Sequence, residues 1–488
     1  MKNFKKNKYL VAIFIVALLL FYPAFSTFFT NDDFFHLYIS RAQSIKDFLN
    51  FFNLLSPVSG FPNYRPISIQ VYYFLGRAIS GLNPIAYRLI SFATFFFVIY
   101  LIYLFVKKIT KSGKISLISA FLYATSATHF AHLYYSGAFQ ELSLALFFLI
   151  SCLYFWKFLE KRNFKNYTIS LAAFILALMS KETALVLPFC LILLYLYRKY
   201  TGGKIVEIKK LVIYMLPFLA LLVGYSYLRI FHYGFASGDS YIWDFSIRRA
   251  VNTLGWYGLW SFNLPEMLVD FVGPGLKFNP NLFRFWSTQI IPIFILFGVF
   301  LSEILYLIFK NARKLFLNHK SLILILFCIA WFITTLIPVL FLPLHKFTFY
   351  LTLPLIGVVT LIGYLTFNLK SRIINLLLIT TWLVLSILTL SLTRDTHWIV
   401  SGGRTAKSVY TYFNKNYSAL KGYKNIVLYD TPEDKSLPWM PTVVLKAVLS
   451  DNNFFKVFYA DKYQAWYSKE SYSGRDAYYI SARQFLGY

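Results

Sequence analysis

The stretch YLVAIFIVALLLFYPAFSTFFTNDDFFH, residues 9–36, joins a long apolar run to two adjacent carboxylates. About twenty consecutive apolar residues are enough for a helix to cross a bilayer. The basic start of the chain and a passable cleavage site at residues 24–26 also suit a signal peptide. The apolar run is longer than that of a usual signal peptide, however, which favours a retained first helix.

Asp32 and Asp33 follow this run directly, where hydrocarbon meets water. A carboxylate at that edge loses hydration, so it is normally absent unless it is paired or used. We therefore interpret the pair as candidate functional residues. The alternative is structural, because Asn31 or Asp33 could cap the N-terminus of a following helix. One carboxylate can cap while the other acts, so both interpretations stay open.

The composition indicates a polytopic membrane protein, because 58% of the 488 residues are hydrophobic and 14% are charged. The net charge of +28 does not indicate nucleic-acid binding, since Lys and Arg cluster in short segments between apolar runs. Cys152, Cys190 and Cys328 are isolated within apolar runs. Disulfide bonds and a cysteine metal site are therefore not expected.

The apolar runs predict about eleven membrane helices and therefore an all-α polytopic fold. Their ranges are about 9–29, 88–106, 115–134, 139–159, 167–179, 184–197, 211–231, 288–309, 321–342, 347–367 and 373–392. Basic residues concentrate in the intervening segments 107–114, 161–165, 198–210, 310–320 and 370–372, which places these segments and the N-terminus in the cytoplasm. We expect a multi-pass protein of a prokaryotic plasma (inner) membrane, with the C-terminus and Asp32 extracytoplasmic.

Three segments outside the predicted helices are long enough to carry function. A first outer loop, about 30–87, contains one or two interfacial helices over residues 34–52 and a breaker cluster at residues 56–62. A second outer loop spans about 232–286. Residues 1–393 form the predicted transmembrane domain, and residues 394–488 form a small extracytoplasmic α/β domain. In that domain we predict strands at residues 426–429, 456–459 and 478–480 and a helix near residues 407–414.

Polar residues recur at the outer ends of the predicted helices, which suggests a cavity that handles a charged substrate at the membrane surface. A carboxylate there can act as a general base, and Arg, Lys and His can hold a phosphate. This combination suits sugar transfer from a lipid-linked phosphate. The residues are Asp32, Asp33, His36, Tyr64, Arg65, His129, His132, Gln140, Glu141, Lys181, Glu182, His345 and Lys346.

Several motifs give this pattern a family resemblance. Asn63-Tyr64-Arg65-Pro66-Ile67, with Gly81-Leu82-Asn83-Pro84 and Tyr87-Arg88, resembles a motif of the TMTC-type protein O-mannosyltransferases. Ser180-Lys181-Glu182 and the segment from His345-Lys346 to Pro354 resemble two further elements of that family. Asp32-Asp33 corresponds to the acidic pair in the first outer loop of the GT-C glycosyltransferase superfamily.

The resemblance covers roughly the first 390 residues and implies an enzyme that transfers mannose, or another hexose or pentose, from a polyprenyl-phosphate donor with inversion. A first-loop carboxylate would be the general base, with Asp32 preferred by position and Asp33 the other candidate. The implied donor-phosphate ligands are Arg65, Lys181, His345 and Lys346. After the last predicted helix the chain departs from the family, because it lacks tetratricopeptide repeats. The acceptor therefore stays open between a protein, a lipid and a glycan.

A further set of residues could contact the acceptor or support the catalytic groups: His36, Tyr64, His132, Glu141, Glu182, Arg248 and Arg249. Each has a structural alternative. Arg65 could snorkel to lipid headgroups, Lys181 and Glu182 could form a local ion pair, and His132 and Glu141 could hydrogen-bond between helices. Asp32 and His36 share a helical face and could hold a divalent metal, although two ligands are too few alone.

Two rival functions fit parts of the sequence. A multi-pass transporter or a flippase of lipid-linked glycans would also have many helices and buried charges, but it would be expected to show internal repeats and broken helices in corresponding halves. A non-catalytic assembly scaffold would tolerate replacement of both Asp32 and Asp33. The gathering of charges at one face favours the transferase, which would act on a membrane-lipid substrate and have no nucleic-acid partner.

Overall fold

The computed structural model describes residues 2–55, 63–203, 205–234, 241–368, 372–474 and 476–486. Within these ranges, eight helices are long and apolar enough to cross a membrane, and three shorter apolar helices accompany them. They occupy the positions of the eleven predicted spans, so the polytopic all-α architecture is confirmed. These helices are α1 (Lys2–Phe21), α5 (Pro84–Thr110), α6 (Gly113–Ala124), α8 (Phe139–Lys161), α9 (Phe164–Leu178), α10 (Leu187–Tyr200), α11 (Ile208–Tyr227), α14 (Asn281–Leu317), α15 (His319–Leu340), α16 (Leu355–Asn368) and α17 (Arg372–Thr396).

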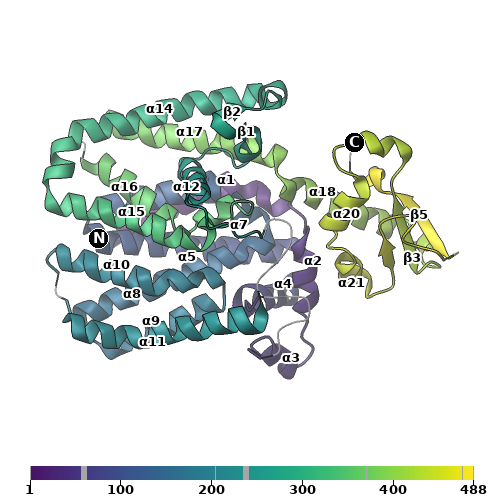
Figure 1. Cartoon of the computed structure of the whole chain (residues 1–488), viewed down its shortest axis with the longest axis horizontal. Helices are drawn as coiled ribbons and strands as arrows, with labels where there is room; N and C mark the ends of the chain where they lie inside the picture. The colour runs from purple at the N-terminus through teal and green to yellow at the C-terminus, as the bar shows by residue number, and fades with distance from the viewer. Residues whose placement is uncertain are drawn as a thin grey trace.

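The long helices lie side by side, and Figure 1 shows the N-terminus and the C-terminal part at opposite ends of the bundle. At the end near the C-terminal part lie the short helices of the first outer loop, α2 (Asp32–Ile39), α3 (Ile45–Asn50) and α4 (Tyr72–Ser80). The predicted helical stretch 34–52 is thus two helices, and a capping box between Ser44 and Asp47 starts the second of them. The predicted breaker cluster at residues 56–62 lies outside the described residues.

Two predicted membrane helices are shorter than expected because each predicted range includes a separate helical turn. The prediction 115–134 becomes α6, a helical turn at Ala127–His129, and α7 (Phe130–Tyr134). Ser126 accepts a hydrogen bond from the Thr128 amide, and Asn263 accepts one from the Ala127 amide at 2.9 Å, which satisfies the backbone where the helix stops. The prediction 347–367 likewise contains a separate turn, Thr348–Leu351, before α16 begins.

The second outer loop is more ordered than the sequence suggests. It contains α12 (Ile247–Trp260), α13 (Leu268–Phe271) and a two-stranded antiparallel hairpin of β1 (Val272–Gly273) and β2 (Lys277–Phe278). Glu266 accepts hydrogen bonds from the amide and the hydroxyl of Thr348, both at 2.6 Å, and contacts His397. These contacts tie the loop to the chain just before α16 and to the end of α17.

The C-terminal part is an α/β unit around three parallel strands, β3 (Asn425–Tyr429), β4 (Gln464–Trp466) and β5 (Ala477–Ser481), in the order β4-β3-β5. Its helices are α18 (Trp398–Lys415), α19 (Tyr417–Leu420), α20 (Pro441–Val448) and α21 (Asn453–Tyr459). The strands predicted at 426–429 and 478–480 and the helix near 407–414 are confirmed. The strand predicted at 456–459 is wrong, because α21 buries Phe454, Phe455 and Val457 on one helical face.

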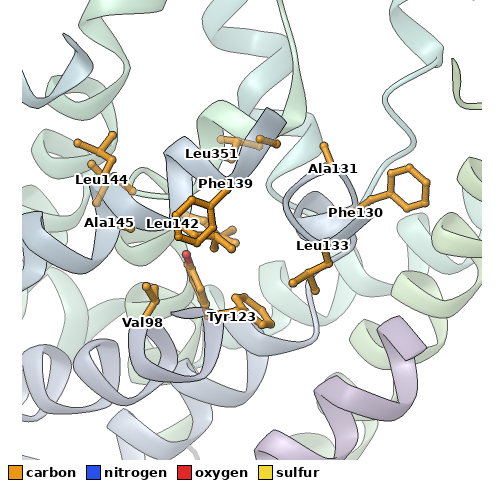
Figure 2. Close-up of a cluster of buried hydrophobic side chains, with 14 of the residues drawn as sticks. Val98, Tyr123, Phe130, Ala131, Leu133, Phe139, Leu142, Leu144, Ala145 and Leu351 are labelled. Atoms are coloured by element: carbon orange, nitrogen blue, oxygen red, sulfur yellow. The ribbon is translucent and has the colours of Figure 1, made fainter. Parts of the chain in front are cut away.

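A buried apolar core fixes the elements beneath the outer loops. Figure 2 shows Val98 of α5, Tyr123 of α6, Leu133 of α7 and Leu142 of α8 facing one another. The Tyr123 hydroxyl donates to the Thr352 carbonyl at 3.0 Å. This core therefore holds the segment around Thr348–Leu351, which supplies one wall of the candidate site.

Candidate active site

The acidic pair begins α2 and is held by the C-terminal part. Asn31 adopts a left-handed backbone, with φ of 50°, which Asn tolerates better than most residues, and its amide donates to the Val448 carbonyl at 2.8 Å. Gly402 of α18 lies against Thr30, because a Cβ at Gly402 would be 2.5 Å from the Thr30 hydroxyl oxygen. The backbone leading into Asp32 is thus fixed by two elements remote in sequence.

Asp33 is fully buried and its carboxylate is occupied by protein contacts. One oxygen accepts a hydrogen bond from the Tyr73 hydroxyl, and the other accepts one from the Thr30 amide at 3.2 Å. Burial raises the pKa of Asp33 to about 6, against the lowering effect of the nearby Arg88 guanidinium. These contacts are those of a structural carboxylate that holds the start of α2. The predicted side-chain cap from Asn31 does not form.

Asp32 differs from its neighbour because its side chain is exposed to solvent. The Tyr135 hydroxyl and the positive charge of Arg65 both lower the pKa of Asp32, but desolvation by the surrounding atoms outweighs them and raises it above its usual value. Asp32 is thus accessible, partly desolvated and close to a cation. These properties suit a general base.

His36 lies one helical turn after Asp32 and is buried. Burial and the nearby Arg65 charge lower the pKa of His36 to about 3, so its imidazole is neutral at physiological pH. Among the described residues, no group of three His, Cys, Asp or Glu side chains could hold a metal ion.

Two neighbouring ion pairs lie near the acidic pair; the first joins the first outer loop to the bundle, and the second lies within the bundle. Arg65 donates through Nε to Glu182 at 2.8 Å and through its two terminal nitrogens to Glu182 and Gln140. Lys181 donates through Nζ to Glu141, and both of these side chains are almost completely buried. The structural alternative predicted an ion pair between Lys181 and Glu182. Instead, each of these residues pairs with a partner from a distant segment. Each carboxylate neutralises one cation, which lowers the cost of burying the charges.

Aromatic rings close the cluster from the side of the last helices. The Lys181 ammonium lies 4.5 Å from the centre of the Tyr350 ring, within the range of a cation–π contact. The His345 ring lies 4.1 Å from the ring of Tyr241, which belongs to the second outer loop. Burial and the charges of Lys181 and Arg65 lower the pKa of His345 to about 4, so this residue is a neutral imidazole and not a cation.

Other predicted site residues do not join this cluster. Lys346 is adjacent to Asp270, and its pKa is lowered by burial. Arg249 pairs with Asp244 at 3.0 Å, and Arg248 is exposed on α12. The Tyr64 hydroxyl donates to the Phe52 carbonyl at 3.0 Å, and His132 lies 2.7 Å from the Thr352 hydroxyl. Tyr64 and His132 thus both contact neighbouring protein groups.

The sequence-based site prediction missed several residues of this region. Tyr73, Arg88, Tyr135 and Tyr241 lie near the acidic pair, and Tyr350 lies beside Lys181. Arg88 carried a usable signal, because a charge inside a membrane helix is rare unless it is paired or functional. The tyrosines carried none, since the chain contains 38 of them.

The fold and the cluster define a multi-pass membrane protein with an accessible carboxylate and buried ion pairs at one end of its helix bundle. Comparison with known protein families relates part of the chain to one family. Residues 65–227, about a third of the chain, match the family model of dolichyl-phosphate-mannose-protein mannosyltransferases. The predicted resemblance to protein O-mannosyltransferases is thereby confirmed for this segment, which holds Arg65, Glu141, Lys181 and Glu182.

Two solved structures of ArnT from Cupriavidus metallidurans, one in the apo state and one bound to undecaprenyl phosphate, also match the chain. Both have 14% sequence identity and a TM-score of 0.47. The first match covers 87% of this chain and 82% of ArnT, and the second covers 94% and 90%. No curated protein sequence matches the chain significantly.

Proposed function

We propose that this protein is a membrane glycosyltransferase that moves a sugar from a polyprenyl-phosphate donor to an acceptor at the extracytoplasmic face. The observation that carries the proposal is the contrast within the acidic pair. Asp33 is buried and hydrogen-bonded, whereas Asp32 is accessible, has a raised pKa and lies near Arg65. The family match of residues 65–227 supports the same class of reaction.

In this proposal Asp32 takes the proton of the acceptor hydroxyl as its oxygen attacks the anomeric carbon of the sugar. The new carbon–oxygen bond forms as the bond between the anomeric carbon and the phosphate oxygen breaks, and the lipid phosphate leaves as an anion. Attack opposite the leaving group inverts the anomeric configuration. General-base catalysis of this kind contributes roughly 10²–10⁴-fold to the rate.

The leaving phosphate needs positive charge or hydrogen-bond donors within the low-dielectric cluster. Lys181 uses one of its donors on Glu141, so further ammonium protons can reach a phosphate. His345 is a neutral imidazole at the edge of the cluster, and it contributes no positive charge. All three guanidinium nitrogens of Arg65 contact Glu182 or Gln140, so we assign Arg65 mainly to positioning Glu182 and to the local potential.

The experiment that tests the class of donor supplies purified protein with a panel of radiolabelled polyprenyl-phosphate sugars and, in parallel, the matching nucleotide sugars. We expect label to leave at least one lipid donor and no nucleotide sugar. A panel with and without added divalent cations shows whether release needs a metal. Release from a nucleotide sugar alone would overturn the lipid-donor assignment, and lipid translocation without release of label would favour a flippase.

A further inference from the structure

A second recess lies among helix ends remote from the acidic pair, where α5, α8 and α10 end and α15 begins. It has a volume of about 1000 Å³, at the upper end of the usual range for ligand pockets. Six cationic side chains line it, and Glu160 is the only acidic residue among its lining residues. The cations are Lys107, Lys108, Lys111, Lys157, Arg198 and Lys320. We call this the basic recess.

Glu160 already has three donors and does not neutralise the whole recess. It accepts from Lys108 at 2.9 Å, from Arg198 at 3.3 Å and from the Trp156 indole at 2.9 Å. Arg198 is almost fully buried and also stacks on Trp156. This network fixes Lys108 and Arg198 as one wall of the recess and leaves it strongly positive.

An apolar surface lies directly beside the cations. Leu101, Leu104, Ile150 and Leu153 form an apolar wall on α5 and α8, one to two helical turns from Lys108 and Lys157. A soluble anion would make no favourable contact with these apolar side chains. An amphiphile whose headgroup is anionic satisfies both parts, because its acyl chains cover the leucines while its phosphate meets the lysines.

We propose that the basic recess binds an anionic phospholipid, with the headgroup phosphate among Lys107, Lys157 and Lys320 and the first part of the acyl chains against the apolar wall. The bound lipid joins four membrane helices at the end of the bundle that the charge pattern places in the cytoplasm. This site is separate from the proposed transferase centre and does not depend on that function.

Native mass spectrometry of the intact detergent-purified protein tests the proposal, with phosphatidylglycerol and phosphatidylcholine of identical acyl chains as probes. We expect preferential retention of phosphatidylglycerol. The combined variant Lys107→Gln, Lys157→Gln and Lys320→Gln removes three cations but leaves the Glu160 network intact, so its affinity for phosphatidylglycerol should fall by more than about tenfold. The matched control, Lys161→Gln, Lys165→Gln and Lys209→Gln, removes three exposed cations outside the recess and should bind as the wild type does.

A second variant, Leu101→Trp, fills part of the recess without changing its charge, so it should also lower the retention of phosphatidylglycerol. This variant keeps the test valid if the charge variant folds poorly. Equal retention of both lipids, or equal binding by the charge variant and its control, would overturn the proposal. In the last part of the experiment, inorganic phosphate is added as a competitor of the lipid. If it displaces the lipid and raises the thermal stability as much as phosphatidylglycerol does, the site belongs to a free phosphate and the lipid assignment is wrong.

Discussion

Asp32 and Asp33 are adjacent in the chain, yet their surroundings assign them different tasks. The Asp33 carboxylate accepts hydrogen bonds from Tyr73 and Thr30 and lies near the buried Arg88, so both of its oxygens already have protein partners. Asp32 keeps an accessible carboxylate with a raised pKa. The difference arises at the start of α2, where the first side chain, Asp32, turns toward solvent and the next, Asp33, turns into the protein.

Replacing Asp33 should therefore affect stability. In Asp33→Asn the buried Arg88 loses its nearby negative charge, which costs about 1–3 kcal/mol, so we expect a lower thermal unfolding midpoint in detergent. Asp32→Asn, at an exposed position, should leave the midpoint unchanged. Equal midpoints for the two variants would contradict the structural role of Asp33.

Tyr135 should set the pH dependence of the reaction. Its hydroxyl lowers the pKa of Asp32, so Tyr135→Phe should raise that pKa further. Since a base works only when deprotonated, activity is lost as the pH falls through the pKa, and the acid limb of kcat/KM should move to higher pH. The control is Tyr38→Phe, an exposed position on α2, the helix that holds Asp32, and it should leave the acid limb in place. An acid limb that stays in place, or moves to lower pH, would argue against Asp32 as the titrating base.

At the scale of elements, two contacts position the acidic loop. One is the approach of α18 to the backbone before α2. A valine at Gly402 would collide with Thr30, displacing Asp32, and a misplacement near 1 Å can cost about 10²-fold in rate. We therefore expect Gly402→Val to lose turnover about 10–100-fold. Gly422→Val, where added side-chain atoms meet open space, should keep wild-type turnover. Similar turnover in both variants would show that α18 does not position Asp32.

The other contact joins the first outer loop to the turn that precedes α10, through Arg65 and Glu182. This pair is partly buried, and removing one partner leaves the other charge uncompensated, so each single variant should lose about 1–3 kcal/mol of stability. Thermal unfolding of Arg65→Ala, Glu182→Ala and the double variant forms a double-mutant cycle. The double variant should lose less stability than the sum of the single losses. Strict additivity would mean that the pair is not coupled.

The sequence predicted elements well where apolar periodicity dominates and poorly where side-chain hydrogen bonds decide. The long spans need only composition and length, which is why their positions agree with the structure. The early end of α6 depends on Asn263, more than 130 residues away, which no local pattern reveals. The residues 456–459 satisfy the composition of a strand, and only tertiary burial of Phe454 and Phe455 makes them helical. The acidic pair was recognisable because charge at a membrane edge is costly, whereas its tyrosine neighbours were not.

At the scale of the whole molecule, the charge pattern makes a prediction about orientation. Because basic residues gather at the turns remote from the C-terminal part, those turns should face the cytoplasm. The three native cysteines are buried, so single exposed cysteines can be introduced against a low background. A membrane-impermeant thiol reagent should label Lys421→Cys in intact cells and Lys161→Cys only after permeabilisation. The reverse pattern would place the candidate site in the cytoplasm.

The central claim is that Asp32 acts on the reacting groups and does not merely support the fold. The most direct test measures donor binding and single-turnover sugar transfer in the same Asp32→Asn preparation. The account predicts an unchanged dissociation constant for the lipid donor and a transfer rate lower by roughly 10²–10⁴-fold. Wild-type transfer by Asp32→Asn would contradict it.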